Sequence, residues 1–283
     1  SMLADTTHLL IAPDGPLHLV PFEALRTSAG RYVLEDHLVT YLTTGRDLLR
    51  LSAARPSSGA SAIFADPAFG LSRPQPAASF ARLAGTAGEA RRILPALPDA
   101  SIRVGAAASE REVKGLSAPR VLHIATHGFF QPNNAHQSPP ENPLLRSGLA
   151  LAGANAGESR GEDGILTALE AANLDLWGTR LVTLSACDTG IGVVRNGEGV
   201  YGLRRAFFLA GAETLVMSLW PVSDLVTRDM MTGYYSGLKD GLGRGAALRR
   251  VQLRLMRQPG RRHPFYWASF IQAGEWANLA GQR

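Results

Sequence analysis

Two side chains in this sequence have the types and the positions of a catalytic pair. Cys187, the one cysteine among 283 residues, follows the apolar run Leu181–Ala186 and precedes the glycine-bearing stretch 188–192. His127 follows a second apolar run, Val121–Thr126, sixty positions upstream. Reacting groups gather at the carboxyl ends of strands in open α/β sheets, and a single cysteine with a distant histidine is a candidate nucleophile and base. The sequence therefore predicts a Cys–His dyad.

The elements that must position this pair are apolar runs of strand length that alternate with longer segments of helical periodicity. Such alternation indicates a mostly parallel sheet with helices on both faces. The expected strands are Leu9–Ala12, Leu17–Val20, Val39–Thr43, Ala62–Ala65, Ile102–Gly105, Val121–Thr126, Ser147–Leu151, Leu181–Ala186, Thr214–Leu219 and Tyr266–Ala273. The expected helices are Arg46–Ala53, Ala78–Leu97, a short one through Val113–Leu116 capped by Ser109, Ile165–Leu174, Gly197–Ala210, one from Ser223 and Asp224 to Leu238, and Arg244–Arg257. We predict an α/β fold.

Length and composition favour a soluble domain with a sizeable core. The chain is 45% hydrophobic, and its single cysteine excludes an internal disulfide, which fits a reducing cytoplasm. No uncharged apolar run approaches the roughly 20 residues of a membrane span. The Pro- and Ser-rich stretch Pro56–Ser61 is a plausible linker. We therefore expect a cytoplasmic protein with no membrane contact, a small β-containing N-terminal part over residues 1–55 and a catalytic domain over residues 56–283.

The net charge of +5 comes from arginine, since lysine occurs only at Lys114 and Lys239. The GK[ST] triplet of a phosphate-binding loop is absent, and a Schiff-base lysine would have few candidates. Arginines concentrate in residues 244–262, but no aromatic side chains are interleaved with them. Solvated helix faces explain this pattern better than a nucleic-acid site does, so no nucleic acid is expected as a partner.

Ordered blocks along most of the chain resemble the CHAT family, whose caspase-like domains are often joined to tetratricopeptide repeats. These blocks are His123–Phe130, Gly164–Ala168, Leu184–Gly190, Asn196–Val200, Ser218–Asp224 and Pro264–Phe270. The resemblance implies a caspase-like α/β sandwich and a cysteine endopeptidase that cleaves a protein substrate without a cofactor or metal. It also implies regulation by attached domains or partners, such as a tetratricopeptide-repeat region in the parent chain.

The chemistry expected of the dyad follows from the properties of a thiol and an imidazole. A thiol with a pKa of roughly 8.5 needs a neighbouring base or positive dipole to become a thiolate at neutral pH. The resemblance assigns the oxyanion hole to the backbone N–H groups of Gly128 and Cys187. A glycine lets substrate approach the backbone closely. His127 would protonate the leaving amine and later activate water. No third residue that orients the dyad can be assigned from the sequence.

Each of these residues also has a plainer interpretation. A lone cysteine after an apolar run is usually a small buried hydrophobe, and His127 alone would more often be a loop or core histidine. His123 is read as a packed strand histidine. His123 and His127 suggest zinc by their spacing, but Ile124 stands where a zinc protease would have glutamate. The main alternative function is a caspase-fold module that binds partners without cleaving them.

The resemblance also suggests where the side chain before the scissile bond would bind. In caspase-like folds that pocket borders the loop after the strand that follows the nucleophile strand, here Trp220–Asp224. Asp224 and Asp163 are candidates to meet a basic side chain by a charge-assisted hydrogen bond. The competing expectations are an apolar pocket floored by Trp220, with Asp224 as a helix cap and Asp163 as a turn residue.

Overall fold

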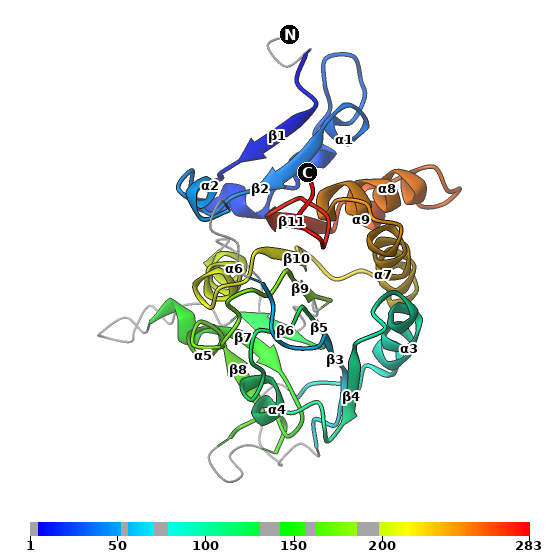
Figure 1. Ribbon diagram of the computed structural model, residues 1–283. Helices are drawn as coiled ribbons and strands as arrows, with labels where there is room; N and C mark the ends of the chain where they lie inside the picture. Colours follow the sequence, from blue (N-terminus) through cyan, green and yellow to red (C-terminus); the bar gives the residue numbers. More distant parts are fainter. Residues whose placement is uncertain (1–4, 52–55, 71–78, 131–141, 157–161, 186–197) are drawn as a thin grey trace, which may run out of the picture.

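A computed structural model describes residues 5–51, 56–70, 79–130, 142–156, 162–185 and 198–283. An eight-stranded sheet forms the middle layer (Figure 1). Its order is β1 (His8–Ile11), β2 (Leu38–Tyr41), β11 (Phe270–Gly274), β10 (Thr214–Ser218), β9 (Leu181–Leu184), β5 (Val121–Ala125), β3 (Ala62–Pro67) and β4 (Ser101–Gly105). Among these described strands only the neighbours β10 and β11 are antiparallel. The predicted α/β fold with a mostly parallel sheet is confirmed.

Both faces of the sheet are buried, which explains why its strands read as continuous apolar runs. In β5, Leu122 and Ile124 belong to one hydrophobic cluster, while Val121 and Ala125 belong to a second cluster on the opposite face. All four residues are 0% exposed. Successive side chains of a strand point to opposite faces, so a strand covered on both sides needs apolar residues at every position.

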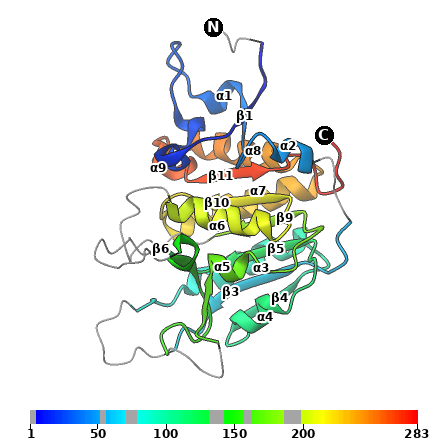
Figure 2. The ribbon, with the colours of Figure 1, turned by 90° about the vertical axis from the view of Figure 1, so that its left-hand side faces the viewer.

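Helices cover the two faces of the sheet (Figures 1 and 2). The face of the sheet that carries Val121 and Ala125 is covered by five helices, which pack with Ile63 and Val216. They are α1 (Val33–Asp36), α3 (Ala84–Ile93), α7 (Asp224–Lys239), α8 (Arg244–Met256) and α9 (Pro264–Trp267). The opposite face is covered by α4 (Glu110–Lys114), α5 (Ala168–Ala171) and α6 (Glu198–Leu209). A short helix α2 (Asp47–Arg50) follows β2. No helix in the described part of the chain is long and apolar enough to cross a membrane.

A small antiparallel sheet extends from the end of the histidine strand. It comprises β6 (Gly128–Phe130), β7 (Ser147–Ala150) and β8 (Ile165–Thr167), in that order. Leu149 and Leu166 of this sheet are fully buried in the same cluster as α5 and α6. The small sheet therefore fastens the backbone immediately after His127 to the core.

Three expected elements differ in type from the structure. The segment 17–20 is not a strand, because a 3₁₀ helix (Gly15–Leu19) with proline near its start occupies it. The start of the expected helix 165–174 is strand β8, and α5 begins after Thr167, whose hydroxyl caps it in a capping box with Glu170. The expected strand 266–273 begins as helix α9, since Pro264 starts a helical turn there, and only its later part is β11.

Helix starts follow the expected capping chemistry only in part. The Ser109 hydroxyl accepts the Glu112 N–H at 3.3 Å and caps α4. Ser223 stands at the corresponding position before α7 but makes no capping hydrogen bond with its side chain. The remaining short helices are 3₁₀ segments at Phe22–Ala24, Leu94–Ala96 and Pro143–Leu145.

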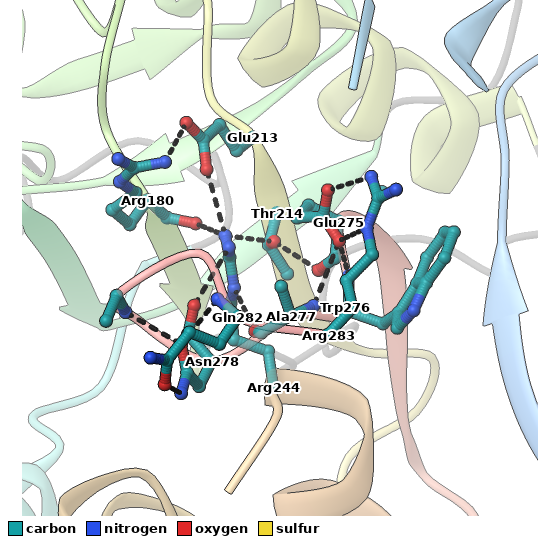
Figure 3. Close-up of polar contacts among 12 residues, drawn as sticks. Arg180, Glu213, Thr214, Arg244, Glu275, Trp276, Ala277, Asn278, Gln282 and Arg283 are labelled. Atoms are coloured by element: carbon teal, nitrogen blue, oxygen red, sulfur yellow. Dashed lines mark hydrogen bonds and ion pairs between the residues drawn. The ribbon is translucent and has the colours of Figure 1, made fainter. Parts of the chain in front are cut away.

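A buried arginine fastens the C-terminal segment to the amino ends of β9 and β10 (Figure 3). The Arg244 side chain is 0% exposed, and its Nη1 donates to Thr214 Oγ1 at 2.8 Å and to Glu213 Oε2 at 3.3 Å. Its Nε donates to the carbonyl of Ala277 at 2.8 Å. Glu213 also binds Arg180 at 2.7 Å, so each charge of this cluster has a partner. This network therefore lies at the amino ends of β9 and β10, whereas His127 follows the carboxyl end of β5.

Candidate active site

The register of β5 and β9 pairs the two residues that stand three positions before the candidate catalytic residues in the sequence. Ile124 and Leu184 are paired, and the Ser185 N–H donates to the carbonyl of Ile124 at 2.9 Å. His127 follows Ile124 by three residues, and Cys187 follows Leu184 by three residues. Cys187 itself lies outside the described residues. The described carboxyl ends of β5 and β9 therefore lie side by side, and the pairing of Cys187 with His127 stays a prediction.

The His127 imidazole is held by a backbone group that the sequence did not reveal. The side chain is almost fully buried, with 3% of the residue exposed. Its Nε2 lies 2.6 Å from the carbonyl oxygen of Ala81, in the segment before α3. A carbonyl can only accept, so Nε2 carries a proton, and in the neutral ring the lone pair is then on Nδ1. The Ala81 carbonyl thus fixes both the orientation and the tautomer of His127.

Aromatic side chains surround the histidine ring. The ring centroids of Phe69 and Phe80 lie 5.3 and 5.6 Å from that of His127, and Phe80 also packs against Phe129 at 5.9 Å. Tilted rings at these distances are favourable contacts. They come from three separate segments, after β3, before α3 and in β6. This packing limits the rotation of the imidazole and shields it from bulk water.

The backbone N–H of Gly128, the predicted oxyanion donor, is left free of the small sheet by the strand register. The Ala150 N–H donates to the carbonyl of His127 at 2.9 Å, and the next pair along the two strands is Gly128 with Leu149. Hydrogen-bonded and non-hydrogen-bonded pairs alternate in an antiparallel ladder. The Gly128 N–H therefore points away from β7 instead of joining the ladder.

A pocket of about 190 Å³ opens beside the strand ends, and we call it the β10 pocket. It lies over the carboxyl ends of β5, β9 and β10 and is closed by the first turns of α3 and α7. Its polar lining includes Ser185, two residues before Cys187, together with Thr126 and Ser218. Two carboxylates also line it, Glu89 from α3 and Asp224 from α7.

The three residues predicted to bind substrate are placed differently from one another. Asp224 lines the β10 pocket and packs so closely on Gly85 that an added Cβ there would lie 2.4 Å from its Oδ2. Asp163 does not line this pocket; it is exposed and accepts the Ile165 N–H at 2.8 Å, which is the turn role considered for it. Trp220 is half-buried, does not line the pocket either, and donates from its indole to the carbonyl of Phe265 at 3.0 Å.

Glu89 is the pocket residue that sequence reasoning missed. It is 2% exposed, and its Oε1 lies 3.0 Å from Nε2 of His123. Nδ1 of His123 lies 3.1 Å from the hydroxyl of Tyr235, which donates to Thr183 at 3.0 Å. Glu89 sits within an ordinary helical pattern, so nothing in its sequence context marks it. The prediction that His123 is a packed strand histidine is confirmed, and no group of three or more potential metal ligands occurs among the described residues.

Several of the clustered arginines bind groups of the protein itself. Arg249 donates to the carbonyls of Leu34 and Glu35 at 2.8 and 2.7 Å. Arg261 pairs with Asp229 at 2.9 Å, and Arg244 is buried as described above. These contacts assign a structural role to part of the arginine excess.

Comparison with known proteins decides the family. The family model for the CHAT domain matches residues 2–275. The chain belongs to the CHAT domain family. The resemblance inferred from the ordered sequence blocks is thereby confirmed for this CHAT domain.

Two curated relatives carry the same name. Tetratricopeptide repeat protein 28 of Homo sapiens is 27% identical to this CHAT domain over an alignment 303 residues long, gaps included. The alignment covers 94% of the chain and 12% of the human protein. Tetratricopeptide repeat protein 28 of Mus musculus is 33% identical over 110 residues, which cover 39% of the chain and 4% of the mouse protein. The chain therefore spans about one eighth of the human relative.

A solved structure supports the fold. The Saccharomyces cerevisiae separase–securin complex at 3.0 Å resolution contains a chain that superposes with a TM-score of 0.50 and 16% identity, over 91% of this CHAT domain and 14% of that chain. At this identity the likeness shows the fold alone, which is caspase-like.

Proposed function

We propose that this CHAT domain is a cysteine endopeptidase of the caspase-like type, with Cys187 as nucleophile and His127 as general acid and base. The observation that carries the proposal is the pairing of Ile124 in β5 with Leu184 in β9, since His127 and Cys187 each follow one of these residues by three positions in the sequence. The Ala81 carbonyl supports it, because a base oriented by a third group is the usual arrangement around an activated nucleophile.

The proposed reaction has two stages. His127 takes the proton of the Cys187 thiol on Nδ1, and the resulting thiolate attacks the peptide carbonyl. The backbone N–H groups of Gly128 and Cys187 stabilise the oxyanion. Each such donor contributes about 3–4 kcal/mol to transition-state stabilisation. His127 gives its proton to the leaving amine as the C–N bond breaks, which leaves a thioester on Cys187. The neutral His127 then takes a proton from water, whose oxygen attacks the thioester and releases the acid and the thiol.

The β10 pocket is the proposed site for the side chain before the scissile bond. Asp224 stands at its edge and Glu89 at its buried end, so the pocket presents two carboxylates. Glu89 already lies 3.0 Å from Nε2 of His123. A guanidinium or ammonium group would pair with the Asp224 carboxylate at the pocket edge, whereas an apolar side chain would offer that carboxylate no partner. We therefore expect a preference for Arg or Lys. Asp163 is not part of this proposal, because the structure gives it a turn role outside the pocket.

Active-site labelling tests the dyad directly. A peptidyl acyloxymethyl ketone with Arg before the reactive group should alkylate Cys187 under reducing conditions, as detected by intact mass. Labelling should be lost in Cys187→Ala and slowed by several orders of magnitude in His127→Ala, while His263→Ala serves as the matched histidine control. Peptide cleavage within tenfold of wild type in either dyad variant would refute the assignment.

The second candidate function is a non-catalytic protein-interaction module. It is favoured by the names of the two relatives, which are tetratricopeptide repeat proteins and not peptidases by name. A folded wild-type domain that stays unlabelled, alone and with the repeat region of its parent chain added, would support this module over the endopeptidase.

Substrate scanning tests the pocket assignment separately. Peptides with Arg, Lys, Leu or Met before the scissile bond should be cleaved best with Arg or Lys. Asp224→Asn should reduce that preference, whereas Asp229→Asn, on the same helix but paired with Arg261, should not. Best cleavage after Leu or Met, unchanged in Asp224→Asn, would overturn the acidic pocket and leave the dyad intact.

A further inference from the structure

A second pocket, of about 360 Å³, lies on the other side of the histidine, and we call it the β3 pocket. It is lined by residues 66–70, which end β3 and follow it, by Phe80 and Arg82, and by Gly105 at the end of β4. Ligand pockets are on the order of 300–1,000 Å³, so this one has room for a single large side chain.

The two pockets are separated by His127 and by the segment before α3. In the order of the sheet, the β10 pocket lies over β10, β9 and β5, whereas the β3 pocket lies over β3 and β4. Phe80 and Arg82 face the β3 pocket, and Leu83, the next residue, faces the β10 pocket. The histidine ring contacts Phe69 and Phe80, so it forms part of the boundary.

The β3 pocket combines an aromatic lining with one fixed cation. Asp66 has a φ of +44°, in the left-handed region that non-glycine residues rarely adopt. Its N–H donates to Thr86 at 2.8 Å, and its two carboxylate oxygens accept from Arg82 at 3.0 and 2.8 Å. Arg82 nevertheless keeps 76% of its side chain exposed. Asp66 thus holds a guanidinium at the edge of the pocket while leaving much of it accessible.

The proton transfers of the proposed reaction decide which part of a substrate reaches this pocket. His127 must protonate the leaving amine, which belongs to the residue after the scissile bond. The substrate therefore passes from the nucleophile strand β9 across His127 toward β3. Residues before the scissile bond lie on the β10 side, and residues after it lie on the β3 side.

We propose that the β3 pocket binds a large apolar or aromatic side chain in the leaving part of the substrate, immediately after the scissile bond, where it packs on Phe69 and Phe80. The Arg82 guanidinium donates to a peptide carbonyl of the same segment. This inference rests on the proposed endopeptidase, and it extends substrate recognition to both sides of the cleaved bond.

Cleavage of matched peptides tests it. Internally quenched peptides that share the best sequence before the scissile bond carry Phe, Leu, Ala or Asp after it. We expect kcat/KM for Phe and Leu to exceed that for Ala by about tenfold, which corresponds to about 1.4 kcal/mol. Ala68→Phe narrows the pocket and should bring the ratio close to one. Ala29→Phe, at an exposed alanine outside both pockets, should preserve it.

A binding measurement separates this inference from the proposed activity. Fluorescein-labelled heptapeptides with Arg followed by Phe or by Ala are titrated into Cys187→Ala, with and without Ala68→Phe, and followed by anisotropy. Tighter binding of the Phe peptide that is lost in Ala68→Phe supports the pocket even if wild type cleaves nothing. Cleavage without a preference after the scissile bond, or a preference that Ala68→Phe leaves unchanged, overturns the pocket and leaves the endopeptidase standing.

Discussion

Replacing Arg244 by methionine should strongly destabilise this CHAT domain. Methionine keeps the apolar stem of the side chain but removes a guanidinium that is 0% exposed. The carbonyls of Ala277 and Arg180 and the hydroxyl of Thr214 would each lose a charged donor. The residues that follow β11 would also lose the arginine contacts drawn in Figure 3, while β11 itself stays paired with β10.

The size of the effect follows from the burial of these groups. A hydrogen bond to a charged group contributes about 1.5–3 kcal/mol, and bonds from one guanidinium are not additive. Removing one partner of a buried ion pair costs about 3–5 kcal/mol. Glu213 keeps Arg180 at 2.7 Å, which limits the cost of its lost partner. We therefore expect a loss of about 3–5 kcal/mol in the free energy of unfolding.

Arg250→Met is the matched control, because Arg250 lies on the same helix but its pair with Asp240 is exposed. The side chains of that pair are 47% and 53% exposed, and such pairs contribute at most about 1 kcal/mol. Guanidinium unfolding followed by circular dichroism gives both values from the midpoints and slopes. If the two variants differ from each other by less than about 1 kcal/mol, the argument from burial is wrong.

Three further predictions concern stability. Tyr235→Phe should cost about 1–3 kcal/mol in the free energy of unfolding, because two buried partners lose its hydroxyl. Tyr234→Phe should be neutral or stabilising, because the Tyr234 hydroxyl is buried with no hydrogen-bond partner among the described residues. Equal losses of the two variants in denaturant unfolding would contradict this. Gly274→Ala should lower the free energy of unfolding far more than Gly281→Ala, although both glycines have φ near +87°. An added Cβ at Gly274 would lie 2.2 Å from a backbone carbonyl oxygen, whereas one at Gly281 would meet nothing within 4 Å. Similar melting temperatures of the two variants would exclude the steric explanation. Burial raises the pKa of Glu23 from 4.5 to about 7, so its contribution to stability is fully present below about pH 4.5 and is lost as pH rises through 7. Relative to Glu23→Gln, the free energy of unfolding of the wild type should fall by about 3 kcal/mol between pH 4 and pH 8. Parallel pH profiles of the two proteins would refute the shift.

The sequence by itself determined the fold class and most strands. Fully buried strands need apolar side chains on both faces, so β3, β5, β9 and β10 stand out as continuous apolar runs. Short helices and strands were harder to predict from the sequence, because tertiary packing and local capping decide where they begin and end. Thr167 illustrates this, since its capping box with Glu170 starts α5 three residues later than periodicity indicates.

The position of His127 at the carboxyl end of a buried strand was also predictable from the sequence, because reacting groups gather at such strand ends, whereas its pairing with Cys187 stays a prediction. What surrounds the pair was decided by tertiary structure alone. The Ala81 carbonyl, the Phe69 and Phe80 rings and the Glu89 carboxylate reach the site from segments far from His127 in the chain. A backbone carbonyl leaves no mark in a sequence, and a glutamate within a helical pattern has the same local context whether it faces solvent or a pocket. Asp163 shows the converse, because the residue type was suitable but the fold placed it at a turn.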